Sequence, residues 1–232
     1  MKSIKAIFIK QSIDLIKNRS ILIQFAVFPV IAFIMTELVA KADESIPDNM
    51  FTIMFATMFA GMVILTTAAN IIAEDKELKS LRFLIMAGVK PHEYLFGIGG
   101  ALIFSSLLIS IVFAFMGNFT GREFIIFISV ILLSSTASMI LGASIGILSK
   151  NQQSAVATGM PIAMVLAFCP LVTMFNKTAE KIFFIFYTQQ MSIVMNNLST
   201  GIIHPLLIIL ANIAVYTVFF SIVYKKKGLK SL

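Results

Sequence analysis

The sequence is poor in charge. Only 12% of its 232 residues are Asp, Glu, Lys or Arg, whereas soluble domains average about a quarter. Hydrophobic residues make up 59% of the chain, and the mean hydropathy is +0.97. This composition excludes an ordinary soluble domain and predicts an integral membrane protein.

Three further absences narrow the function. The single cysteine, Cys169, lies in an apolar stretch, so a disulfide framework is excluded. No G-x-x-x-x-G-K-[ST] loop is present, so we expect any ATP hydrolysis, with its ATP and Mg²⁺, on another chain, and no cofactor or metal here. No acidic or basic residue lies mid-way along an apolar run, which disfavours a proton-coupled carrier and, more weakly, a sodium-coupled one.

Six apolar runs are each long enough to cross the hydrocarbon core as a helix. Together they predict one all-α membrane domain over residues 21–224, with no room for a separate soluble domain. The predicted spans are roughly Ile21–Val39, Met50–Ala73, Leu95–Gly117, Phe124–Leu148, Ala155–Thr173 and Pro205–Tyr224.

The basic residues predict the orientation. Fourteen of the 18 Lys and Arg residues fall on one side of this topology, in residues 1–20, 74–94, 149–154 and the basic tail 225–232. Cytoplasmic loops carry that excess, so we expect a multi-pass protein of a bacterial inner or plasma membrane with both termini cytoplasmic. The positive charge then faces the anionic inner leaflet, and nucleic acid is not an expected partner because aromatic residues do not alternate with the basic ones.

Residues 1–20 carry two apolar stripes in helical spacing. Such a helix suits the inner membrane surface, with one flank against lipid and one against protein, although a frayed basic tail is the alternative. The stripes consist of Ile4, Phe8 and Leu15 and of Ile9, Ile13 and Ile16.

Residues 174–204 are too apolar for a solvent loop and too interrupted for a seventh crossing. A pair of short re-entrant half-helices in the outer leaflet fits this pattern, provided that protein shields their backbone ends. The alternative is an external loop with a hydrophobic patch.

Small residues recur every four positions along the fourth span, at Ser134, Ser138, Gly142 and Gly146. Such a ridge lets another helix backbone approach closely, so we predict helix packing there. The same region contains a G-x-S-x-G pattern around Ser144, and His204 begins the sixth span, as in an intramembrane serine protease. Their depths differ by roughly 25 Å, whereas a nucleophile and its base need about 3 Å, so we reject that function.

Between the second and third spans lies a charged stretch with an apolar face at Leu78, Leu81 and Ile85. We predict a cytosolic amphipathic helix over about residues 74–90, with its acidic residues in the first turn and a stop at Gly88 and Pro91. The chain here resembles the permeases of ABC-2 type exporters. Three segments carry the resemblance: Glu74-Asp75-Lys76-Glu77, Leu81–Met86 and Val89–Tyr94.

The resemblance implies that this helix is a coupling helix that docks on a separate ATP-binding-cassette ATPase. It also implies a second permease subunit, identical or similar, with the transport path between the two. The chain itself would not be an enzyme; it would export an amphipathic or hydrophobic cargo such as a peptide or drug-like compound. An ATP-independent carrier or channel is the alternative. The implied ATPase contacts are Glu74, Asp75, Glu77, Leu78, Leu81, Arg82, Leu84 and Ile85.

Overall fold

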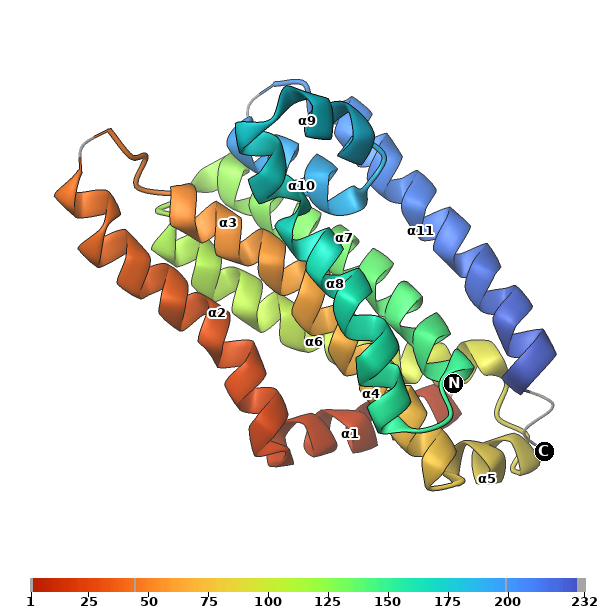
Figure 1. The fold of residues 1–232 in the computed structure, drawn as a ribbon. Coiled ribbons are helices and arrows are strands. Elements are labelled where there is room, and N and C mark those ends of the chain that lie inside the picture. The colour runs from red at the N-terminus through yellow and green to blue at the C-terminus, as the bar shows by residue number, and fades with distance from the viewer. Residues whose placement is uncertain (1, 44, 199, 229–232) are drawn as a thin grey trace.

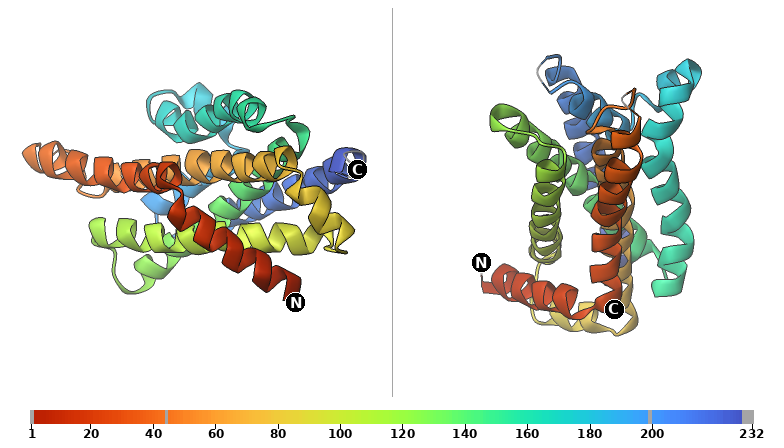
Figure 2. Two further views of the ribbon diagram at one scale, coloured as in Figure 1. Left: turned by 90° about the horizontal axis from the view of Figure 1, so that it is seen from below. Right: turned by 90° about the vertical axis from the view of Figure 1, so that its left-hand side faces the viewer.

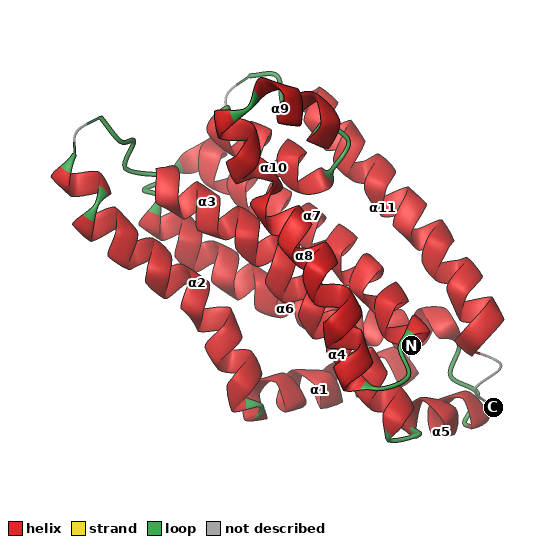
Figure 3. Cartoon of the chain, in the orientation of Figure 1, coloured by secondary structure: helices red, strands yellow, loops and turns green. Residues whose placement is uncertain are grey.

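The computed structural model describes residues 2–43, 45–198 and 200–228, and every regular element within them is a helix (Figure 3). Within these residues, six helices are long and apolar enough to cross a membrane, so the predicted all-α membrane fold is confirmed. The spans are α2 (Arg19–Leu38), α3–η2–α4 (Met50–Met58, Phe59–Val63 and Ile64–Glu77), α6 (Pro91–Met116), α7 (Gly121–Leu148), α8 (Gln152–Phe175) and α11 (Ile203–Val223). A short turn, η1 (Ala40–Ala42), follows α2, and η3 (Tyr224–Gly228) extends α11.

The second span lies at the centre of the bundle. In its most apolar stretch 78% of the residues are buried, against 22% for α2 and 17% for α11. Within a membrane, lipid is as apolar as a leucine side chain, so buried positions mark helix packing and not hydrophobicity. The exposed faces of α2 and α11 are therefore the ones available to lipid or to another subunit.

The closest helix contact is the seam between α4 and α7. A Cβ atom on Gly142 would stand 2.2 Å from the carbonyl oxygen of Leu65, and one on Gly146 would stand 2.7 Å from that of Ala69. Neither position tolerates a side chain without moving a backbone. The structure thus places the ridge of small residues, Ser134, Ser138, Gly142 and Gly146, against the second span, with all four buried.

The N-terminal helix α1 (Lys2–Lys17) runs across the long helices and not along them (Figure 2). It meets α6 at Gly97, where a Cβ atom would stand 2.5 Å from Cγ2 of Ile7. Ile7 and Leu15 are buried, whereas the second apolar stripe, formed by Ile9, Ile13 and Ile16, is exposed. A helix with one flank on protein and one apolar flank free is what the two stripes predict. It ends before Asn18, which caps α2.

The predicted helix over 74–90 is wrong in one respect: it is two helices. The span helix α4 continues to Glu77, the chain turns at Lys79 with φ of +59°, and α5 (Ser80–Met86) follows. Glu74, Asp75 and Glu77 therefore end a span and do not begin the short helix. The predicted stop is confirmed: Gly88 has φ of +81°, and the amide of Val89 donates to the carbonyl of Leu84 (3.0 Å), as in a Schellman cap.

At the opposite end of the bundle, two short helices stand between α8 and α11 (Figure 1). They are α9 (Lys177–Phe183) and α10 (Tyr187–Asn196), where a pair of half-helices is predicted. Helices α1, α5 and η3 lie together at the other end, called the α1/α5 end below, which the charge distribution predicts to be cytosolic. The α9/α10 end is then external.

Candidate functional site

Helix α5 presents apolar side chains at the end of the bundle that carries most of the charge. Phe83 and Met86 on α5 are exposed by 64% and 61%, and Leu78 in the preceding turn is also exposed. Leu84 is partly buried and packs against the core. The side chains of the other predicted contacts, Leu81, Arg82 and Ile85, lie outside the described residues.

Exposed apolar side chains on a short helix are unusual at an end that is predicted to face the cytosol, because burying them against a partner is favourable. The α5 surface is therefore a candidate docking surface. Its shape is fixed by the two turns that bracket it, at Lys79 and Gly88.

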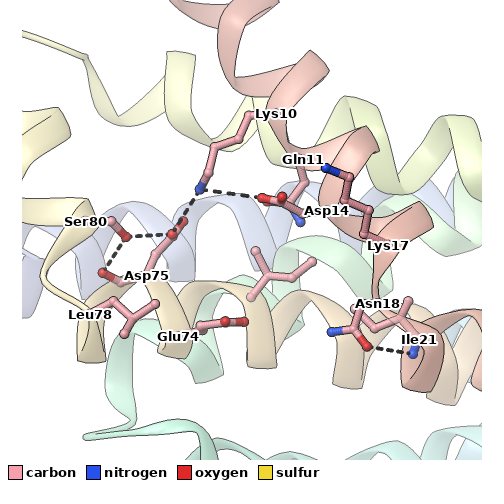
Figure 4. Close-up of a pocket in the computed structure, with 11 residues that line it drawn as sticks. Lys10, Gln11, Asp14, Lys17, Asn18, Ile21, Glu74, Asp75, Leu78 and Ser80 are labelled. Carbon is pink, nitrogen blue, oxygen red and sulfur yellow. Dashed lines mark hydrogen bonds and ion pairs between the residues drawn. The ribbon is translucent and has the colours of Figure 1, made fainter.

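Asp75 connects α5 to three other helices. Its carboxylate accepts hydrogen bonds from the Tyr94 hydroxyl of α6 and the Ser80 hydroxyl of α5, each at 2.7 Å. Lys10 of α1 approaches the same carboxylate to 3.7 Å (Figure 4). Asp75 itself is only 7% exposed. A buried carboxylate is stable only with such partners, so Asp75 is used inside the chain and is not presented to a partner.

The neighbours of Asp75 connect the same turn of α4 to two further spans. The Lys76 ammonium donates to the carbonyls of Ile147 (2.8 Å) and Ser149 (2.7 Å), at the end of α7. The Glu77 carboxylate accepts from the backbone amide of Gln152, the first residue of α8 (3.1 Å). A cation at a helix C-terminus and an anion at a helix N-terminus are both favoured by the helix dipoles.

The last turn of α4 therefore touches α1, α5, α6, α7 and α8 through polar side chains. A displacement of α5 would be passed to all of these helices at once. Sequence reasoning missed this junction, because it assigned the acidic residues to an outward-facing first turn. The sequence signal that could have revealed it is a basic residue, Lys76, between acidic neighbours at the end of an apolar run.

A family model described as ABC-2 family transporter protein matches residues 2–224, nearly the whole chain. The chain belongs to the ABC-2 transporter family. No curated protein matches its sequence. Family membership makes the chain a membrane transport component, a permease, which is not itself catalytic.

The permease has a second polar cluster, in the middle of the bundle. The five residues of η2 form a π-helical turn, in which the usual bonding to the fourth following residue is interrupted. The Ser138 hydroxyl of α7 donates to the Ala60 carbonyl in this turn and is hydrogen bonded to the Tyr187 hydroxyl of α10 (2.6 Å). Helix α10 is thereby connected to α7 directly and to η2 through Ser138. Ser138 thus forms hydrogen bonds in addition to the close helix packing predicted for it.

Ser144 and His204 are not brought together in the permease. The Ser144 hydroxyl donates to the Ile140 carbonyl of its own helix (2.9 Å), one turn from the α1/α5 end of α7. The His204 ring lies against Phe184, with ring centroids 5.8 Å apart, at the start of α11. Within the described residues no hydrogen bond connects them, which agrees with the rejection of a protease function.

Proposed function

We propose that this ABC-2 permease is the membrane half of an exporter that is driven by a separate ATP-binding-cassette ATPase docked on α5. The observation that carries the proposal is the junction at Asp75, which connects the exposed helix α5 to the spans. A docking helix transmits work only if it is fixed to what it must move. Here the polar contacts of the last turn of α4 connect α5 to α4 itself and to α1, α6, α7 and α8.

The proposed contact surface consists of Leu78, Phe83 and Met86, with Glu74 as its exposed carboxylate. Leu81, Arg82 and Ile85 belong to the same helix and remain part of the proposed surface. Asp75 is proposed to hold α5 in place and not to touch the ATPase. ATP and Mg²⁺ would be bound by the partner, since the chain contains no phosphate-binding loop.

The complete exporter is proposed to hold two permease subunits, identical or similar, in a bacterial inner or plasma membrane with both termini cytoplasmic. The cargo proposed is an amphipathic or hydrophobic compound such as a peptide or a drug-like molecule. Its support is compositional: the chain has 22 Phe and 14 Met and few charges. ATP-driven closure of the ATPases would displace α5 and switch access from the inner to the outer side.

The test is co-purification with ATP-binding-cassette ATPases encoded beside the permease. Phe83→Asp combined with Met86→Asp places two charges on the docking surface, which is expected to abolish the complex and ATP-dependent efflux. Because both side chains are exposed, the variant permease should remain folded and elute normally from a sizing column in detergent.

The matched control is Phe83→Leu combined with Met86→Leu, which changes the same two exposed side chains and keeps the docking surface apolar. This control should keep the complex. If the α5 variant still bound the ATPase and exported its cargo, the docking proposal would be refuted. Efflux that continued without any ATPase would indicate a carrier or channel instead.

A further inference from the structure

A polar cavity of about 470 Å³ lies between α1 and the end of α4, beside the Asp75 junction (Figure 4). Acidic and basic side chains both line it, and some of them have no ion pair or hydrogen bond within the described residues. Lys10 is shared between Asp75 and Asp14, at 3.7 and 3.8 Å. Lys17 and Glu74 also face the cavity, and neither has an ion pair or side-chain hydrogen bond within the described residues. One cation and one anion are thus left for a ligand.

Gln11 supplies a second and independent indication of a ligand. Its side chain lines the cavity and is only 5% exposed, yet its amide has no hydrogen-bond partner in the described part of the chain. The polar atoms of the amide open into the cavity, so without a ligand they can bond only to water there. An amide that offers both a donor and an acceptor is well suited to a ligand that carries both kinds of group.

The cavity adjoins an apolar groove. Ile21, at the start of α2, lines it and also lines an apolar groove of about 350 Å³ between α1, α2 and α6. The groove walls include Leu15, Phe25 and Leu108. The exposed apolar flank of α1, formed by Ile9, Ile13 and Ile16, belongs to the helix that forms one wall of this groove. A molecule with a zwitterionic head and an apolar tail would therefore find matched surfaces on the two sides of the corner between α1 and α2.

We propose that this corner binds a membrane phospholipid whose headgroup is a phosphoester bearing a primary ammonium, as in phosphatidylethanolamine. The phosphate lies by Lys17 and Gln11, the ammonium by Glu74, and an acyl chain follows the apolar groove. A purely anionic headgroup is disfavoured because the lining carries Asp14, Glu74 and Asp75 against two lysines. A choline headgroup is weaker than ethanolamine because its quaternary ammonium donates no hydrogen bond to Glu74.

The test uses the full-length permease, freed of lipid in detergent and titrated with dioctanoyl phosphatidylethanolamine, phosphatidylcholine or phosphatidylglycerol. Native mass spectrometry measures binding, and thermal unfolding measures the stabilisation by bound lipid. We expect the affinity to fall in the order ethanolamine, choline, glycerol. Water-soluble glycerophosphoethanolamine is the arm that separates the headgroup from the lipid. It should bind at least about tenfold more weakly, because it lacks the apolar tail.

Two variants locate the site. Gln11→Leu should weaken phosphatidylethanolamine binding by about tenfold or more and leave the unfolding temperature of the lipid-free protein nearly unchanged, because the amide can bond to water in the empty cavity. Lys17→Met with Glu74→Gln should abolish the preference for ethanolamine over glycerol. Lys5→Met, on an exposed face of α1 outside the cavity, is the control and should change neither quantity.

Equal binding of the three lipids, with an unchanged affinity of Gln11→Leu for phosphatidylethanolamine, would overturn the proposal. Glycerophosphoethanolamine that bound as tightly as the lipid would keep the headgroup site and overturn its membrane source. The readouts need no ATPase. Glu74 is proposed for both surfaces, so failure here assigns Glu74 to the docking surface alone and leaves the docking proposal for Phe83 and Met86 unaffected.

Discussion

The two ends of this permease are held by different chemistry. At the α1/α5 end, full charges make the connections, as Asp75 and Lys76 show. At the α9/α10 end the contacts of α10 and α11 with their neighbours are neutral: Thr173 donates to Gln189 (2.8 Å), and Asn212 donates to the Ile185 carbonyl (2.9 Å). The ion pair of Lys41 with Glu37 at that end joins residues one turn apart and connects no two spans. A charge is costly in a lipid-like environment, whereas amides and hydroxyls are tolerated when paired. The contrast agrees with the prediction that α5 faces the cytosol and that α10 belongs to a re-entrant pair.

Both ends are attached to the same α4–α7 seam. Asp75 and Lys76 lie at one end of α4, and the bond from Ser138 to Ala60 lies further along the same pair of spans. The two ends therefore use different kinds of polar contact, but both are connected to the same pair of packed helices. Changing the seam should affect both ends, and changing one end should affect that end first.

The largest effect is expected for Gly142→Ala. Its Cβ atom would stand 2.2 Å from the Leu65 carbonyl oxygen, so the two helices must separate, at a cost of about 3 kcal/mol of stability. Hydrogen exchange should rise at both ends together. Thermal and denaturant unfolding in detergent measures the loss.

Gly159→Ala is the matched control, because a Cβ atom there meets nothing closer than 3.8 Å. It should be neutral or should stabilise slightly, since alanine favours the helix. An equal loss from both variants would show that the seam is not the tight contact described here.

The second effect is expected for Asp75→Ala. It leaves the buried Tyr94 hydroxyl without its acceptor and removes one of the two partners of Lys10 and of Ser80, which should cost about 2 kcal/mol. Exchange should rise in α5 and α1 while α10 stays protected. Asp75→Asn should recover part of the loss, because Ser80 and Tyr94 donate to different carboxylate oxygens and the amide oxygen can still accept one of the two hydroxyl protons.

Asp48→Ala, an exposed aspartate in the connection before α3, is the control and should stay within about 0.5 kcal/mol of the parent. If Asp75→Ala loosened α10 as much as α5, the two ends would not be separable and the comparison would fail.

The sequence predicts the fold well and the junction poorly, for physical reasons. Span lengths follow from hydrocarbon thickness, and the stop of α5 follows from Gly88, so local rules find both. The burial of Asp75 depends on Lys10 and Tyr94, which lie 65 and 19 positions away along the chain. No local sequence pattern predicts that pairing. None predicts that Lys79 takes a left-handed conformation either. The π-helical turn is likewise fixed by a hydroxyl from another span.

The smallest effect is expected at the neutral end, for Tyr187→Phe. The Ser138 hydroxyl still donates to the Ala60 carbonyl but loses its bond to Tyr187, so the cost should be about 1 kcal/mol. Exchange should rise in α10 and leave α5 unchanged. Tyr216→Phe, a tyrosine on α11 with no hydrogen bond within the described residues, is the matched control and should be near neutral.

Ser138→Ala removes both bonds of that cluster, so it should cost more than Tyr187→Phe, and the double variant should cost no more than Ser138→Ala alone. This non-additivity is the signature of a shared bond. Additive losses would mean that Tyr187 holds α10 by packing alone. In that case α10 would be held by side-chain packing without a polar contact from Tyr187. The difference from the charged junction at Asp75 would then be larger.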